Sequence, residues 1–404
     1  MRKLLTSSNS VILIVAFVSI VGLLTSIAGA EITPALGIEV ENYYVNPHGC
    51  HVPAVGDVGE CINSFDFFKN RLYYTTGKKI MTEYGPSCDV GFKVYKVLGK
   101  SHRMRIVVSY DDVFGFSGGR IKRYGNCMLF NDGGMANFER MFDYYIFDPK
   151  RKPTVVNKLY DSTEAPGYNL WGLSTRRGTE LWAAGTPPFP DVFDNNKIFY
   201  SSIDFDDDDY GNHCGIDYSD GNQSITSIGD VGAGGTGPLA FDSRGNLYYA
   251  QGWNGSVYPP DLYDSLIYRF SADEVAAAID DPVNNRLVII DPNEDDPHVW
   301  ETILISEAIG VSSMIFVEDI GLVLTATSLH GSSQLRLYTI NREDGTSGDY
   351  TVLAFSDGRM SEIRYRLGKI YFNDPDGIYY IDATQLIDDD DDDDDDRRRR
   401  RRRR

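Results

Sequence analysis

Amphipathic stretches with a helical period are nearly absent from this 404-residue sequence. After the N-terminus, it also lacks any apolar run of about 20 residues, the length a helix needs to cross a membrane. Positive charge is scarce, since 39 Lys and Arg residues face 59 Asp and Glu residues, for a formal net charge of -20. Such a surface repels nucleic acid and anionic lipid. We therefore expect no nucleic-acid partner and no transmembrane helix in the mature chain.

Cysteine is also sparse: the five residues are Cys50, Cys61, Cys88, Cys127 and Cys214. No C-x-x-C-H sequence occurs, so covalently bound haem is not indicated, and we expect no nucleotide cofactor either. Cys50 and Cys61 are close together in a segment with Gly and Pro, which predicts a disulfide between them in an exported protein. A metal site built from Cys50 with His48 and His51 is the alternative. The pairing of the other three cysteines stays open.

The N-terminus has the three parts of a signal peptide. Arg2 and Lys3 supply the positive charge, and the apolar stretch 11–24 follows. Residues 28–30, Ala-Gly-Ala, then form a signal-peptidase site, so the mature chain is predicted to begin at Glu31. An uncleaved membrane anchor is the alternative, but an apolar core of about 14 residues is short for a bilayer. The sequence thus predicts a signal peptide over residues 1–30 and a secreted or cell-surface protein.

One pattern recurs along the rest of the chain: a turn with Gly or Asn, then a short strand of aliphatic and aromatic residues. It occurs at 70–74, 125–130, 196–200, 245–249, 321–324 and 368–372. A second predicted strand follows each of these, at 92–97, 144–147, 216–218, 267–270, 335–340 and 378–381. Asp-Gly and Asp-Pro turns separate the pairs. The pattern is typical of an all-β repeat protein.

Six strand pairs at this spacing predict a β-propeller with six blades, in which small sheets stack around an axis. Seven blades are the alternative count. This length is too large for a single β-sandwich domain, and the spacing of the strand pairs is too long for a β-helix. We assign residues 31–66 to an N-terminal segment with the disulfide and residues 67–387 to the propeller. One short helical insertion is expected near 272–279, with Ser271 and Glu274 forming a capping box.

The run 237–250, Gly-Pro-Leu-Ala-Phe-Asp-Ser-Arg-Gly-Asn-Leu-Tyr-Tyr-Ala, resembles one repeat of the NHL and SMP-30-like six-bladed propellers. Those blades have a similar order of apolar strand, Asp-x-x-Gly-Asn and second apolar strand. The resemblance covers about 14 residues, far less than one domain. It implies the fold, and the group includes calcium-dependent lactonases as well as binding scaffolds. The metal ligands of the lactonases do not map onto this sequence residue by residue.

A cluster of carboxylates is the sharpest local feature with a chemical use. Its candidate calcium ligands are Asp204, Asp206, Asp207, Asp208 and Asp209, with Gly211 and Asn212 nearby. Calcium takes six to eight oxygen ligands, which clustered carboxylates can supply. The loop is not an EF-hand, because position six is Asp209 and position twelve is Gly215. A solvated acidic loop is the alternative interpretation.

Three functions are compatible with these features. We favour a secreted or cell-surface propeller that binds an extracellular protein or glycan, because a propeller presents loops at a rigid rim and this sequence has long polar loops. The first alternative is a calcium-dependent hydrolase of the lactonase kind. The second is a structural component of an extracellular layer or fibre. The catalytic residues of any such hydrolase are not identified by the sequence.

The C-terminal residues 388–404 are nine Asp followed directly by eight Arg. Such a low-complexity segment predicts disorder. A repeated GAC codon reads as Asp, and the same DNA read two bases later gives CGA, an Arg codon. We therefore interpret the Arg run as a reading-frame slip, so that a surface anchor was lost from the C-terminus. A genuine tail of mixed charge is the alternative.

Overall fold

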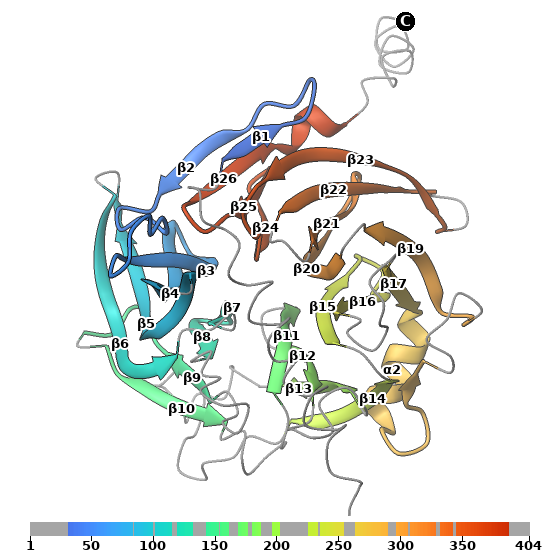
Figure 1. Ribbon diagram of the computed structural model, residues 1–404. Helices are drawn as coiled ribbons and strands as arrows, with labels where there is room; N and C mark the ends of the chain where they lie inside the picture. The colour runs from blue at the N-terminus through green and yellow to red at the C-terminus, as the bar shows by residue number, and fades with distance from the viewer. Residues whose placement is uncertain are drawn as a thin grey trace, which may run out of the picture.

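The computed structural model is a six-bladed β-propeller, as the sequence predicts, with six sheets arranged around a central axis (Figure 1). The structure describes residues 31–83, 85–99, 102–114, 119–131, 143–152, 154–160, 169–176, 180–186, 196–202, 225–232, 235–253, 263–289, 296–305, 308–328, 332–341 and 345–387. The predicted signal peptide, residues 1–30, and the tail 388–404 lie outside these residues. Within them, no helix is both long and apolar enough to cross a membrane.

We number the blades I to VI and give their strands from the axis outward. Blade I contains β3 (Val58–Phe68), β4 (Arg71–Thr82), β5 (Gly85–Leu98) and β6 (Arg103–Phe114). Blade II contains β7 (Ile121–Tyr124), β8 (Cys127–Asn131), β9 (Tyr144–Phe147) and β10 (Val156–Tyr160). Blade III contains β11 (Asn169–Arg176), β12 (Glu180–Thr186), β13 (Asn196–Ser202), β14 (Thr226–Gly232) and β18 (Leu287–Val288).

The second half of the ring follows the same plan. Blade IV contains β15 (Gly235–Phe241), β16 (Leu247–Trp253), β17 (Tyr263–Phe270) and β19 (Val299–Ile305). Blade V contains β20 (Ala308–Val317), β21 (Gly321–Ser328), β22 (Ser333–Ile340), β23 (Ser347–Ser356) and β1 (Ile32–Pro34). Blade VI contains β24 (Ile363–Arg366), β25 (Lys369–Asn373), β26 (Gly377–Asp382) and β2 (Glu41–Val45). A 3-10 turn, η3 (Ala383–Leu386), follows. All strand pairs in these sheets are antiparallel except β14 with β18.

The core of the protein lies between the blades. Six clusters of buried side chains each join two neighbouring blades, so that the ring is continuous. Trp182 of blade III is fully buried, for example, in the same cluster as Tyr249 and Tyr268 of blade IV. A single blade exposes both faces, so packing against its neighbours supplies the burial that stabilises it.

The N-terminal strands complete the last two blades. β1 pairs with β23 in blade V, with Thr33 opposite Phe355, and β2 pairs with β26 in blade VI, with Glu41 opposite Tyr380. Both strands lie on the outer side of the ring beside the C-terminal strands (Figure 1). The 31–66 segment therefore supplies strands to three blades, because β3 is the inner strand of blade I. Closure of the ring joins residues that are more than 300 positions apart in the chain.

The predicted helical insertion is confirmed as α2 (Ala272–Asp280), which lies between β17 and β19. Ser271 Oγ accepts a hydrogen bond from the backbone N–H of Glu274 at 3.3 Å, and Glu274 Oε2 accepts one from the N–H of Ser271 at 2.7 Å. These two bonds are the predicted capping box. Val275 and Ala278 are buried against blades III and IV, which fixes the helix on the ring.

The predicted disulfide between Cys50 and Cys61 is also confirmed, with the two Cα atoms 4.6 Å apart. It joins the segment after β2 to the inner strand β3, and thus blade VI to blade I. Cys50 N–H donates to Asp376 Oδ1 of the β25–β26 turn at 2.6 Å. The bridge therefore reinforces the point at which the ring closes.

Replacing both Cys50 and Cys61 with Ser is expected to lower the free energy of unfolding by about 2–3 kcal/mol, because a short closed loop is released in the unfolded chain. Urea unfolding of the double variant and the parent protein measures the difference. The variant is preferable to chemical reduction, since Cys127 also takes part in a disulfide. Equal free energies of unfolding would show that the bridge is not a stabilising link.

Candidate functional site

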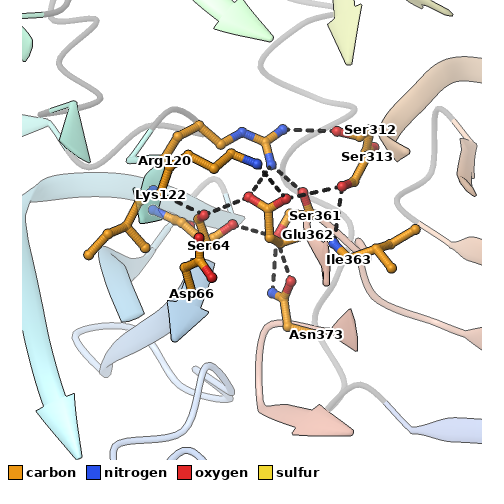
Figure 2. A network of polar contacts seen from close by, with 12 residues as sticks. Ser64, Asp66, Arg120, Lys122, Ser312, Ser313, Ser361, Glu362, Ile363 and Asn373 are labelled. Atoms are coloured by element: carbon orange, nitrogen blue, oxygen red, sulfur yellow. Dashed lines mark hydrogen bonds and ion pairs between the residues drawn. The ribbon is translucent and has the colours of Figure 1, made fainter. Parts of the chain in front are cut away.

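A buried carboxylate, Glu362, lies at the centre of a polar network near the axis (Figure 2). It directly precedes β24, and its side chain is only 1 % exposed. Glu362 Oε1 contacts Lys122 Nζ at 3.1 Å, Ser313 Oγ at 3.1 Å and Arg364 Nη1 at 2.6 Å, and Oε2 contacts Ser64 Oγ at 2.7 Å and Arg120 Nη1 at 3.4 Å. These six residues are called the Glu362 cluster.

The inner strands of four blades bring the Glu362 cluster together. Ser64 comes from β3, Arg120 and Lys122 from the start of β7, Ser313 from β20, and Glu362 and Arg364 from the start of β24. Alternate residues of a strand face the same side. That is why the pair 120 and 122 and the pair 362 and 364 converge on one carboxylate.

The two serines connect neighbouring blades through backbone hydrogen bonds. Ser64 Oγ accepts from the N–H of Ile121 in blade II at 3.1 Å while it donates to Glu362. Ser313 Oγ accepts from the N–H of Ile363 in blade VI at 3.0 Å while it donates to Glu362. Each hydroxyl thus fixes the alignment of two inner strands. The cluster is a structural link across the axis.

Charge compensation dominates the titration of the cluster. Burial raises the pKa of Glu362, but the charges of Arg364, Lys122 and Arg120 outweigh burial and hold that pKa well below its usual range. Burial and the Arg364 charge together lower the pKa of Lys122 to about 7, although the Glu362 charge opposes them. The carboxylate therefore remains ionised throughout the physiological pH range.

A second carboxylate near the axis, Asp66, is also fully engaged. Asp66 Oδ2 contacts Arg364 Nε at 3.3 Å and accepts from the backbone N–H of Arg123 at 2.7 Å. Asp66 Oδ1 accepts from the backbone N–H of Phe67 at 2.6 Å. Calcium requires several carboxylate or carbonyl oxygens with free lone pairs. At Glu362 and Asp66 a cation would first have to displace ammonium and guanidinium groups, so these residues are poor metal ligands.

Within the described residues, Arg359, three positions before Glu362, has no ion pair with a carboxylate. Arg359 lies in the connection 357–362 between β23 and β24, and its Nε is buried without a hydrogen-bond partner in the described part of the chain. Burial, together with the charge of Arg120, lowers the pKa of Arg359 to about 10.

The calcium ligands predicted from the sequence, Asp204, Asp206, Asp207, Asp208 and Asp209, all lie outside the described residues. Calcium binding by that loop therefore stays a prediction. Within the described ranges, no group of three or more His, Cys, Asp and Glu side chains is placed to hold a metal ion. No sequence motif marks the Glu362 cluster, because its members are single charged or hydroxyl residues scattered over 300 positions.

Comparisons with known proteins assign this chain to no family. No family model matches the sequence, and no curated protein sequence matches it. The six sheets of the structure support the NHL and SMP-30-like resemblance at the level of the propeller fold, and the family assignment stays a prediction.

Three solved structures are similar to this chain at low identity. One is the α-L-arabinanase of Penicillium chrysogenum complexed with arabinobiose, with 11% identity, coverage of 88% of this chain and 99% of that one, and a TM-score of 0.45. Another is Sqt1 of Chaetomium thermophilum bound to the N-terminus of ribosomal protein L10, with 12% identity, coverages of 86% and 76%, and a TM-score of 0.41. The third is BamB of Moraxella catarrhalis, with 7% identity, coverages of 88% and 97%, and a TM-score of 0.38.

Proposed function

We propose that this chain is an extracellular β-propeller that acts by binding a protein or glycan. The observation that carries the proposal is the full engagement of Glu362. Its two oxygens contact three cationic side chains and two serine hydroxyls, all held by inner strands. A catalytic acid or base needs a pKa near the working pH. The strongly depressed pKa of Glu362 suits a permanent ion pair instead.

The same interactions make the propeller a rigid scaffold. The cluster ties blades I, II, V and VI together at the axis, while the Cys50–Cys61 disulfide and strands β1 and β2 close the ring at the outside. Binding sites gain affinity when the groups that contact the ligand are fixed before it arrives. A propeller that is held at both the axis and the rim supplies such a support.

The proposal is tested with the full exported chain, captured on a surface and exposed to arrays of extracellular glycans and to the proteins of the secreting cell's surface. Binding that saturates at micromolar concentration or below, together with no hydrolysis of lactone and ester substrates, is the expected result. Turnover of any of those substrates that calcium stimulates and chelation abolishes would overturn the proposal in favour of a hydrolase.

A further inference from the structure

Positive charge in this acidic protein is concentrated in blades I and II, which are neighbours in the ring (Figure 1). Residues 69–152 contain 16 Lys and Arg residues and 8 Asp and Glu residues, whereas the whole chain has 39 against 59. A surface whose charge is opposite to that of the rest of the protein steers partners of the complementary charge to one place. These two blades are therefore the part of the ring that suits an anionic partner.

Cations from both blades meet at the ring of Phe68, the last residue of β3. Arg123 of β7 lies over this ring, with its Cζ 5.7 Å from the ring centre, and Lys150 of the β9–β10 turn lies over it with its Nζ at 6.0 Å. Phe68 pairs with Arg71 across the β3–β4 turn, and Lys69 lies within that turn. All four cationic residues are exposed. Two cations of blade II thus lie beside a turn of blade I that supplies two more.

The same side of blade I continues outward through Lys96 and Arg105. Tyr73 is paired with Lys96, and Lys96 with Arg105, so the three side chains form one row on the sheet. Lys96 Nζ donates to the carbonyl oxygen of Pro149 at 3.2 Å, in the turn that carries Lys150. The row of blade I and the turn of blade II therefore form one continuous surface. We call this the basic surface, made of Lys69, Arg71, Lys96, Arg105, Arg123 and Lys150.

The basic surface is not neutralised from within the protein. In the described part of the chain, none of its six side chains forms an ion pair with a carboxylate. Asp148 Oδ1, in the β9–β10 turn, accepts from the backbone N–H of Lys150 at 2.7 Å. Like charges directly opposite each other on paired strands, such as Lys96 and Arg105, destabilise a sheet. Burial lowers the pKa of Lys96, and the charges of Arg71 and Arg105 lower it as well. An arrangement that costs stability without an internal partner indicates a functional surface.

From this geometry we propose that the basic surface binds a sulfated polysaccharide chain. The inference rests on the proposed binding function and names its glycan partner. Guanidinium and ammonium groups donate charge-assisted hydrogen bonds to anionic oxygens. A sulfate group has three terminal oxygens, so it can accept from two neighbouring cations such as Arg123 and Lys150. A polysaccharide repeats this group along its length, which matches cations that are spread over two blades.

Charge density and stiffness favour a sugar chain over other polyanions. The Debye length is about 8 Å at physiological ionic strength, so the acidic blades act only weakly on a chain that stays on the basic surface. Double-stranded DNA carries one charge per about 1.7 Å along a rigid axis, and it would extend over the acidic remainder of the protein. A disordered acidic polypeptide would lose more conformational entropy than a stiffer sugar chain when it becomes ordered on this surface.

The test uses a heparin oligosaccharide of defined length as the probe. Desulfated heparin of the same length, poly-L-glutamate and a short DNA duplex are the comparison ligands. Isothermal titration calorimetry is performed at several salt concentrations with the exported chain. In every protein, an uncharged Gly-Ser segment of equal length replaces residues 388–404, because the charges of that run would themselves bind a polyanion or the basic surface. We expect saturable binding of heparin that weakens as salt is added, and weaker binding of the other three ligands.

The variants assign the binding to the basic surface. Arg123→Gln should weaken heparin binding at least about threefold, and Arg123→Gln with Lys150→Gln at least about tenfold. The double variant should also lower the slope of log affinity against log salt by about one for each contact removed, an effect that a purely structural role would not produce. Arg244→Gln is the matched control, because Arg244 is exposed in the β15–β16 turn of blade IV. Its affinity should lie within about twofold of the parent, as should that of Arg123→Lys, which retains the charge.

Melting curves without ligand show whether the variants remain folded, and each should melt within about 2 °C of the parent. If the Arg123 and Lys150 variants melt lower, Lys69→Gln with Arg105→Gln provides the same test at two exposed positions. Heparin affinity equal to that of the parent in the folded double variant, or no saturable binding by the parent, would overturn the inference. Binding of desulfated heparin, poly-L-glutamate or DNA as tight as that of heparin would overturn the assignment of a sulfated sugar chain. If other array ligands bind parent and double variant equally, the proposed function stands while this inference fails.

Discussion

Glu362→Gln is expected to lower the free energy of unfolding by about 3–5 kcal/mol, the usual cost of removing one partner from a buried ion pair. The glutamine retains the size of the side chain and one acceptor oxygen, but it no longer compensates Arg120, Lys122 and Arg364. Those three side chains would remain in a site where Glu362 itself is 1 % exposed. Urea unfolding at pH 7 measures the loss.

Glu318→Gln is the matched control, because Glu318 is exposed and carries the same charge. Its free energy of unfolding should lie within about 0.5 kcal/mol of the parent. A double variant, Glu362→Gln with Lys122→Met, removes one stranded cation and should recover part of the loss. If Glu362→Gln proves no more destabilising than the control, the cluster does not hold the blades together.

The strand repeats were predictable because each blade repeats one local pattern. Five of the six predicted turn–strand segments form the second strand of a blade, namely β4, β8, β16, β21 and β25. The sixth, 196–200, forms β13, which is the third strand of blade III. The second strand of that blade is β12, where two polar residues, Thr179 and Glu180, separate Gly178 from the Leu-Trp-Ala-Ala run. Local turn chemistry therefore predicts where strands occur, but it does not predict whether a strand is the second or the third of its blade.

Ring closure had no comparable signal in the sequence. β1 has only three residues, and β2 places the Tyr43 and Tyr44 pair opposite a strand that lies more than 300 positions later. The geometry of the completed ring decides this pairing. An edge strand has unpaired N–H and C=O groups, and it pairs with the strand that the ring places beside it. The disulfide was predictable because its two cysteines are only 11 positions apart.

The Glu362 cluster was unpredictable for a different physical reason. Its charges alternate along two short strands, Arg-Ile-Lys at 120–122 and Glu-Ile-Arg at 362–364. On an ordinary sheet this alternation predicts a solvent-exposed polar face. Only around the axis of a propeller do the polar faces of inner strands meet one another, so that one blade supplies the cations and another the carboxylate.

Asp374→Asn is expected to stabilise the protein above pH 7 by about 3 kcal/mol, because an ionised carboxylate is then no longer buried. Asp374 begins the Asp-Pro-Asp-Gly turn between β25 and β26 and is 0 % exposed. Its Oδ1 accepts from the N–H groups of Asp376 and Gly377, each at 2.8 Å, and the Tyr379 side chain lies beside the carboxylate. Burial, with the nearby Asp376 charge, raises the pKa of Asp374 to about 7. Asn retains the oxygen that caps the turn.

The raised pKa of Asp374 determines how the free energy of unfolding changes with pH. The ordinary pKa of Asp is about 3.9, so between about pH 4 and pH 7 the folded protein binds more protons at this site than the unfolded chain does. The contribution of Asp374 to the free energy of unfolding is fully present below about pH 4 and is lost as the pH rises through 7. The advantage of Asp374→Asn should therefore grow from near zero at pH 4 to its full value at pH 8. Asp349→Asn, which removes the same charge from an exposed position, should show no such rise. Parallel stability curves for the parent and Asp374→Asn from pH 4 to pH 8 would contradict a raised pKa at this turn.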